Sequence, residues 1–244
     1  MASPVSSPLR VAIAGLGFGL KVHLPALRDC PDTEPVALWH PGPERLEQGC
    51  QASGLPGSTD FAALLADPHI EALVIATPPE PRLALARTAL EAGKHLLLEK
   101  PVALNSTDIA ELQRLALARG LCVGVDFEYR AVPLFQQLAR LLEQGVLGDL
   151  WLVKLDWLMS SRADASRPWS WYSSKAAGGG VLGALGTHAF DILGWLVGPA
   201  HGIQSKLSTA IRKRPQGGDR PPAEVDAEDI ALLQMELEER SGRM

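Results

Sequence analysis

The sequence predicts an α/β fold: an N-terminal Rossmann domain with a doubly wound parallel sheet, followed by a C-terminal α+β domain with an open sheet. Short apolar runs alternate with helical segments through residues 9–125, which favours parallel strands joined by right-handed crossovers. A glycine-rich turn follows the first apolar run, at Gly15. The regular alternation ends after residue 126, and longer segments follow. We therefore expect two domains, residues 1–125 and 126–244.

The strand-like segments of the first domain are continuous apolar runs, as is typical of strands buried on both faces. They cover residues 11–14, 35–39, 71–75, 95–98 and 122–125. Helices are expected between them: from the first glycines to about residue 28, over 44–53 and 61–65, up to a stop at Gly93, and from a cap at Asn105 to Gly120. This order of elements predicts the parallel sheet.

The second domain shows a different pattern. We expect a helix over 133–144, a long strand over 150–159, a Trp-rich loop, a glycine triplet, a helix, and strands around 203–211 and 230–237. The chain stops soon after the last strand, which would leave an open sheet edge and an uncovered apolar face, a dimerisation or aggregation hazard. We therefore expect this domain to be incomplete, through a truncated gene product or a partial chain.

Composition limits the class of protein and its partners. Of 244 residues, 46% are hydrophobic and 21% charged, which is ordinary globular usage. The net charge of −5 gives no electrostatic reason to expect nucleic acid as a partner. The three cysteines, Cys30, Cys50 and Cys122, have no C-x-x-C spacing, so we expect neither a disulfide framework nor a metal site.

Two segments bear on location. Residues 1–10 lack the charged and apolar regions of a secretory signal. The apolar stretch over 176–199 is rich in glycine and carries His188 and Asp191 near its middle, which would be costly in lipid. We expect a cytoplasmic protein that makes no use of a membrane.

The first glycine turn has the context of a dinucleotide-binding motif, between a strand and a helix. Gly15 would permit the tight turn, and Gly17 would let backbone N–H groups approach a pyrophosphate at the helix N-terminus. Phe18 and Gly19 complete the candidate contacts. The third glycine of G-x-G-x-x-G is displaced, because Leu20 stands there and Gly19 precedes it, so we expect an altered helix entry. An ordinary glycine-rich turn explains the motif alone equally well.

The end of the second strand bears on the choice of cofactor. NAD sites usually have Asp or Glu there, accepting hydrogen bonds from the ribose 2′-hydroxyl. This strand ends at Trp39-His40-Pro41 and has no carboxylate. His40 would tolerate a 2′-phosphate, which favours NADP slightly over NAD. A surface histidine at a strand end is the alternative.

The tripeptide Glu99-Lys100-Pro101 ends an apolar strand, and ligands bind outside the carboxyl ends of such strands. A lysine there can donate to a substrate oxygen and favour ionisation of an alcohol. Pro101 fixes the local backbone, and a cis bond is one way to do so. An exposed Lys-Pro turn is the alternative.

The segment Gly178-Gly-Gly-Val-Leu-Gly-Ala-Leu-Gly-Thr-His188-Ala-Phe-Asp191 suggests acid–base chemistry. His188 and Asp191 are three residues apart and share one face of a helix. A histidine beside a carboxylate suits proton transfer near neutral pH. A capped core histidine, or a two-ligand metal site lacking further ligands, is the alternative.

These motifs, in this order, resemble the Gfo/Idh/MocA family of NAD(P)-dependent oxidoreductases. Further similar pieces lie at residues 67–79, 89–95 and 129–130, so the resemblance covers about residues 9–237. It implies a Rossmann domain and a C-terminal α/β domain whose open sheet often makes contacts in homo-oligomers. It also implies hydride transfer between the cofactor and a sugar- or polyol-like alcohol or ketone.

The resemblance assigns roles by position. Lys100, His188 and Asp191 match the family's catalytic triplet: His188 would accept the hydroxyl proton, Lys100 would polarise the oxygen, and Asp191 would hold the histidine or the substrate. Thr77 and Pro78 would lie near the nicotinamide ribose.

Three assignments are less direct. Glu99 would lie close to the nicotinamide ribose. Arg82 stands where many family members have histidine, which puts any role of that histidine in doubt. Arg130, Trp169 and Tyr172 are candidate contacts of the small-molecule substrate, although packing is the usual role of a tryptophan.

Two other functions fit parts of the sequence. A non-catalytic dinucleotide-binding sensor or partner protein on the same fold would explain the displaced glycine and the short C-terminus. A reductase of a larger conjugated substrate, such as a tetrapyrrole, would use a similar architecture, although the Lys–His–Asp set favours an alcohol oxygen.

Overall fold

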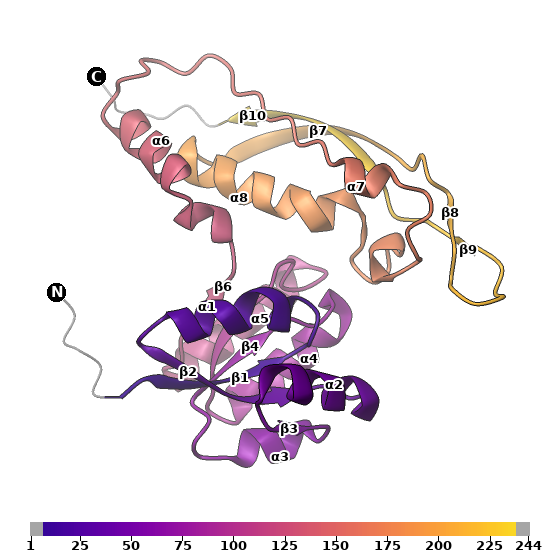
Figure 1. Cartoon of the computed structure of the whole chain (residues 1–244). Coiled ribbons are helices and arrows are strands. Elements are labelled where there is room, and N and C mark those ends of the chain that lie inside the picture. The colour runs from indigo at the N-terminus through magenta and orange to yellow at the C-terminus, as the bar shows by residue number, and fades with distance from the viewer. Residues whose placement is uncertain (1–6, 238–244) are drawn as a thin grey trace. The chain divides into compact units, whose positions relative to one another are not determined.

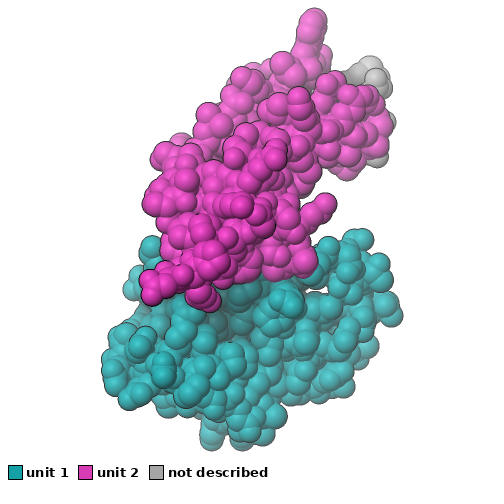
Figure 2. All heavy atoms as spheres, turned by 90° about the vertical axis from the view of Figure 1, so that its right-hand side faces the viewer, with its two compact units in different colours: residues 1–126 teal, residues 127–244 magenta. Residues whose placement is uncertain are grey.

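The structure is a computed structural model that describes residues 7–237 (Figure 1). The chain divides into two compact units, residues 1–126 and 127–244, which Figure 2 colours separately. Residues 1–6, part of the segment expected to lack a signal, and residues 238–244 after the last expected strand lie outside the described part. No helix within residues 7–237 is long and apolar enough to cross a membrane.

The first unit contains a six-stranded parallel sheet in the order β3-β2-β1-β4-β5-β6, which confirms the predicted Rossmann architecture. Its strands are β1 (Leu9–Ala14), β2 (Thr33–Trp39), β3 (Gly57–Ser58), β4 (Ala72–Ile75), β5 (His95–Leu98) and β6 (Val123–Val125). Every strand expected in this half is present, and the two-residue β3 is the addition. The strand order reverses between β1 and β4, where ligands bind in such sheets.

Helices cover both faces of this sheet. They are the π-helix η1 (Gly19–His23), α1 (Leu24–Asp29), α2 (Pro43–Ser53), α3 (Phe61–Ala66), α4 (Pro79–Glu91) and α5 (Ser106–Arg119). Alternate strand residues point to opposite faces. Ala12 and Ala14 therefore join one core with α3, α4 and α5, whereas Val11 and Ile13 join the other with η1, α1 and α2. Burial on both faces explains the continuous apolar runs in the sequence.

The second unit is built on helix α8 (Thr187–Leu196) and the antiparallel pair β7 (Ala200–Ser208) and β10 (Ile230–Leu237) (Figure 1). Its core contains Ile192 and Leu196 of α8, with Phe135 of α6 (Pro133–Glu143) packed against them. The shorter elements are η2 (Glu128–Ala131), α7 (Ser160–Ala163), η3 (Trp171–Ser173), η4 (Leu182–Gly186), β8 (Lys213–Arg214) and β9 (Ala223–Glu224).

The expected strand over residues 150–159 is wrong, because this segment has no regular secondary structure. Its β-forming residues imitate a strand in sequence, but a strand also needs a partner with free backbone groups and a face to bury. Here β7 and β10 pair with each other. Leu152 and Leu158 are exposed, and Trp151 is 96% exposed. The segment therefore has no buried apolar face that would stabilise a strand.

Candidate functional site

The turn after β1 passes very close to the end of β4. Gly15 has φ +105°, and a Cβ there would lie 2.6 Å from the carbonyl carbon of Ala76, so only glycine fits. At Gly17, by contrast, no atom lies within 4 Å of the position that a Cβ would take. A bare backbone facing open space at the start of a helix is the cradle that a pyrophosphate needs.

The displaced third glycine is explained by the π-helix η1. A Cβ at Gly19 would lie 2.7 Å from Ile13 Cγ2, so Gly19 lets the helix pack closely on β1 one residue early. The Leu24 N–H bonds to the Gly19 carbonyl, five residues back, and this wider turn takes up the offset. The expected change in helix entry is therefore this π-turn. Phe18 is 42% exposed beside it, and its ring is T-shaped to the His23 ring with the centroids 5.5 Å apart.

Thr77 and Pro78 lie between β4 and α4, at the end of β4 that the Gly15 turn approaches. Thr77 is buried, and its Oγ1 has no hydrogen-bond partner among the described residues. A buried hydroxyl without a partner costs free energy unless a ligand satisfies it. The Gly17 cradle and this hydroxyl both fit a dinucleotide.

Arg82 on α4 is 3% exposed and holds the ends of β4 and β5 together. Its guanidinium donates to three carbonyl oxygens, those of Thr77, Glu99 and Pro101. The planar guanidinium presents several donors in a fixed geometry, which neither histidine nor lysine can reproduce. Arg82 thus stabilises the turn after β5 that contains Lys100. The Lys100–Pro101 peptide bond in this turn is cis, one of the conformations that the sequence allows.

Glu99 is the centre of a buried polar cluster in the first unit. His23 Nε2 lies 2.9 Å from Glu99 Oε1, and the Lys100 backbone N–H donates to Glu99 Oε2 at 3.2 Å. Burial alone would raise the pKa of Glu99, but the His23 hydrogen bond and the charges of His23, Lys100 and Arg82 hold it below its usual value. Glu99 is therefore ionised at neutral pH and fixes the backbone of Lys100.

Asp126, after β6, completes this cluster. Its Oδ2 lies 3.7 Å from His23 Nε2, and ligand atoms of His23, Glu99 and Asp126 lie within 4.8 Å of one another. Burial and the charge of Glu99 raise the pKa of Asp126. The sequence predicts no metal site, whereas the spacing of these three ligand atoms is compatible with a cation. The alternative explanation is that His23 and Glu99 lie together because they are hydrogen-bonded to each other, without any cation.

His40 lies directly after β2, as expected, and its side chain folds over its own turn. The Gly42 N–H donates to His40 Nδ1 at 3.0 Å. Residues 39–43 carry no carboxylate, and the first acidic side chain of α2 is Glu44. The position that reads the ribose in NAD sites therefore has an imidazole here.

His188 lies on α8 in the second unit and is 2% exposed. Aromatic rings surround it: Tyr129 edge-on at 4.8 Å and Phe127 at 5.8 Å between centroids, and Trp157 stacked at 6.0 Å. The carboxylate of Glu128 approaches this enclosed imidazole, with Oε2 3.6 Å from Nε2. A histidine enclosed by rings and next to a carboxylate has surroundings that are compatible with proton transfer.

Asp191 lies one turn further along α8, as its spacing from His188 predicts. Both of its oxygens accept from Arg130, at 2.8 Å from Nε and 2.7 Å from the terminal nitrogen. The hydrogen bonds that Arg130 donates to Asp191 raise the pKa of Arg130 further. Arg130 also lies over the Trp195 ring, 5.7 Å from its centroid. This bidentate pair fixes the Asp191 carboxylate.

The other two predicted substrate residues, Trp169 and Tyr172, have different contacts. The Trp169 indole N–H donates to the Glu224 carbonyl at 3.0 Å. Tyr172 stacks on Trp171 with centroids 3.8 Å apart, and the Arg162 guanidinium lies 4.1 Å from the Tyr172 ring centroid.

The sequence motifs do not single out four residues that take part in these contacts: His23, Asp126, Glu128 and Glu228. The first three lie close to segments that the sequence does single out. The spacing of residues in these segments does not show which side chains point into the protein. Glu228 accepts from the Leu182 N–H at 3.0 Å, at the start of the helical segment that leads into α8. Its partner is 46 residues away, so only the fold reveals this contact.

Comparison with known proteins agrees with the motifs. Residues 9–127 match the GFO/IDH/MocA model described as an oxidoreductase family with an NAD-binding Rossmann fold. Residues 135–243 match the model of the GFO/IDH/MocA C-terminal domain. The two matches together extend over most of the chain.

Individual relatives carry related names. An uncharacterized oxidoreductase, sll0816, from Synechocystis is 44% identical over 234 residues, which are 95% of this chain and 63% of that protein. Levoglucosan dehydrogenase from Pseudarthrobacter phenanthrenivorans is 30% identical over 246 residues, covering 92% of this chain and 63% of the relative. The chain thus spans about 63% of the length of these curated relatives.

Solved structures extend the comparison to the fold. Levoglucosan dehydrogenase in complex with NADH and L-sorbose has a TM-score of 0.84 at 28% identity, covering 94% of this chain and 64% of that one. An oxidoreductase domain protein from Kribbella flavida has a TM-score of 0.85 at 26% identity, with the same two coverages.

Proposed function

The chain belongs to the Gfo/Idh/MocA oxidoreductase family, and from this premise we propose that it transfers hydride between a nicotinamide cofactor and a sugar- or polyol-like alcohol or ketone. The observation that carries the proposal is the presence, in one chain, of the dinucleotide turn at Gly15 together with Lys100, His188 and Asp191. A relative named levoglucosan dehydrogenase and another named D-xylose dehydrogenase support a sugar-like substrate.

The cofactor would be held by the first unit. The bare backbone at Gly15, Gly17 and Gly19, with Phe18 beside it, would bind the pyrophosphate through N–H groups at the start of η1. Bound nicotinamide supplies the hydride acceptor or donor.

Residues around the nicotinamide ribose would come from the ends of β4 and β5. The unsatisfied hydroxyl of Thr77 would bond to the ribose, with Pro78 and Glu99 nearby. The family is described as having an NAD-binding Rossmann fold, and the levoglucosan dehydrogenase complex contains NADH. A slight preference for NADP is the finer proposal, and it rests on the imidazole of His40 where NAD sites have a carboxylate.

Three side chains would handle the alcohol. As hydride leaves the carbon, the hydroxyl proton passes to the imidazole of His188, which becomes an imidazolium. The ammonium of Lys100 would donate to the same oxygen and stabilise the developing negative charge. Asp191, held by Arg130, would bind or orient the reacting groups.

Substrate contacts and assembly complete the proposal. Arg130, Trp169 and Tyr172 stay predicted substrate contacts. The cofactor domain would comprise residues 1–125 and the substrate domain residues 126–244. A homo-oligomer through the sheet of β7 and β10 is proposed from the exposed apolar residues of that sheet, which include Ile203 and Leu232.

The test is a titration of the purified protein with NADH and with NADPH, followed by tryptophan fluorescence, and then a hydride-exchange assay with sugars, polyols and ketones. We expect saturable quenching and turnover of at least one polyol. The absence of a response to either cofactor would contradict the proposal. Binding without any hydride exchange would favour the non-catalytic sensor instead.

A further inference from the structure

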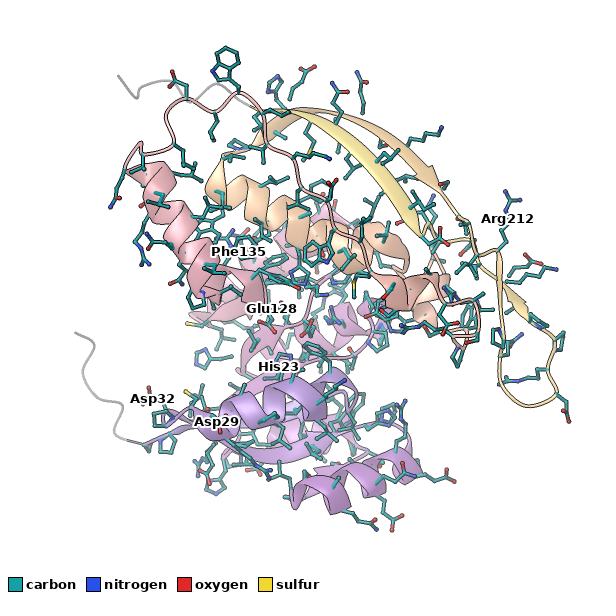
Figure 3. All side chains as sticks on the ribbon, turned by 45° about the horizontal axis from the view of Figure 1, so that its top comes forward. His23, Asp29, Asp32, Glu128, Phe135 and Arg212 are labelled. Atoms are coloured by element: carbon teal, nitrogen blue, oxygen red, sulfur yellow. The ribbon has the colours of Figure 1, made fainter. Side chains whose placement is uncertain are left out.

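Three consecutive residues of the turn η2 contact the His–Asp pair of α8. The Tyr129 ring is T-shaped to the His188 imidazole, and Arg130 donates hydrogen bonds to both oxygens of Asp191. Figure 3 labels Glu128, which lies before α6. Its Oε2 lies 3.6 Å from Nε2 of the same imidazole. The carboxylate next to His188 is thus Glu128, while the carboxylate of Asp191 binds a guanidinium.

We propose that Glu128 is the positioning residue of His188, stabilising its imidazolium form, and that Arg130 performs the corresponding task for Asp191. The proposal rests on the proposed function, in which His188 accepts the hydroxyl proton. It differs from the role that the family resemblance implies for Asp191, because it gives the histidine a different carboxylate partner.

The surroundings of His188 make such a partner necessary. The ring is 2% exposed and is enclosed by Phe127, Tyr129 and Trp157. Burial takes water away from an imidazolium, which costs free energy unless an opposite charge lies close by. The titratable groups that face the imidazole in these contacts are Glu128 and Tyr129, and Phe127 and Trp157 add no titratable group.

The geometry defines how Glu128 acts. A separation of 3.6 Å is an ion-pair distance and is too long for a good hydrogen bond, so the carboxylate acts through its charge. Its side chain is 44% exposed and keeps contact with water. If His188 takes the hydroxyl proton of the alcohol, the positive charge on its ring forms beside the negative charge of Glu128. The net charge of the His188–Glu128 pair then changes from −1 to zero, so no uncompensated positive charge is left in the enclosed site.

A titration without substrate tests the proposal directly. In protein labelled with ¹³C and ¹⁵N histidine, NMR follows the His188 ring against pH. Glu128→Gln should lower the titration midpoint of His188 by about one pH unit, because the charged form loses its partner. Glu128→Asp should retain part of the effect. An unchanged midpoint in Glu128→Gln would overturn the proposal.

The chain offers a matched control in Glu111→Gln. The Glu111 side chain is 45% exposed, and its carboxylate also forms an ion pair, with Arg87 at 2.9 Å. This variant should leave the His188 midpoint unchanged. An equal shift in both variants would contradict a specific role of Glu128.

Kinetics separate this proposal from the proposed function. Glu128→Gln should lower kcat by about 10- to 100-fold with little change in KM, and should move the acidic limb of its pH profile to lower pH. If the wild-type protein transfers no hydride, the proposed function fails, while the NMR midpoint still decides the role of Glu128. If the wild type is active and the midpoint stays constant, only the role of Glu128 fails.

Discussion

The carboxylate of Glu228 occupies the space that a Cβ at Gly180 would fill. Gly180 has φ +92°, and the Glu228 carboxylate accepts from the Leu182 N–H two residues later. The last glycine of the triplet noted in the sequence therefore allows the Glu228 loop to approach the start of η4 closely. This contact positions α8, the helix that carries His188 and Asp191.

Gly180→Ala should destabilise the protein strongly. The alanine meets an unfavourable φ and must displace Glu228 from its bond to Leu182, which together cost about 2–4 kcal/mol in the free energy of unfolding. Gly217→Ala is the control, because Gly217 has φ +82° with no atom within 4 Å of its Cβ position. It should cost only about 1 kcal/mol. Urea unfolding measures both, and equal losses would contradict the steric role of Glu228.

Arg82→Lys should also weaken the fold, because a lysine cannot reach all three carbonyl oxygens that the guanidinium holds. Leaving buried carbonyls without donors costs about 2–4 kcal/mol in the free energy of unfolding. Arg87→Lys on the same helix is the control, since the Arg87 side chain is 39% exposed and pairs with Glu111. It should change stability by at most about 0.5 kcal/mol. Denaturant titrations of the two variants check this, and a neutral Arg82→Lys would show that these contacts are dispensable.

Asp126→Asn should stabilise the protein at neutral pH. Because burial and Glu99 raise the pKa of Asp126 in the folded state, the folded protein holds a proton more tightly than the unfolded chain. Stability then falls as the pH rises from the ordinary pKa through the raised one. Asparagine cannot ionise, so the variant avoids this loss.

The expected gain is about 2–4 °C in Tm at pH 7, and it should disappear about one pH unit below the ordinary pKa of aspartate, where Asp126 is protonated in both states. Thermal melts across this pH range measure it. A variant less stable than the wild type at pH 7 would contradict the unfavourable ionisation of Asp126.

His40→Asp should move cofactor preference toward NADH. A carboxylate at the end of β2 can accept hydrogen bonds from the ribose 2′-hydroxyl and repels a 2′-phosphate, so we expect about a tenfold gain in NADH affinity relative to NADPH. His69→Asp is the control, because His69 is exposed on the loop before β4. Fluorescence titrations of both variants with both cofactors give the ratio. An unchanged ratio in His40→Asp would place the ribose elsewhere.

The sheet of the first unit could be predicted because its strands and helices are marked by residues within each segment. Strands buried on both faces must be apolar throughout, as in Val11–Ala14 and Leu96–Leu98, and glycines or caps mark the helix ends. The second unit has a mostly solvent-facing pair of strands, and there the local pattern is weaker. The segment over 150–159 has strand-forming residues but no strand to pair with, and sequence alone does not reveal partners.

The candidate site was partly predictable for the same reason. Motif glycines, Lys100, His188 and Asp191 stand in recognisable local patterns. His23, Arg82 and Glu128 act through contacts between distant segments: Arg82 reaches carbonyls 17 and 19 residues away, and His23 reaches Glu99 76 residues away. The one-residue shift to Gly19 likewise makes sense only with the π-turn in view.

The role of Lys100 in hydride transfer is the central claim, and Lys100→Met tests it most directly. Turnover of a polyol substrate should fall by about 10²- to 10⁴-fold, while NADH affinity, followed by tryptophan fluorescence, stays near the wild-type value. Lys154→Met, at an exposed ion pair with Asp156, should leave both quantities unchanged. Undiminished turnover in Lys100→Met would contradict the account.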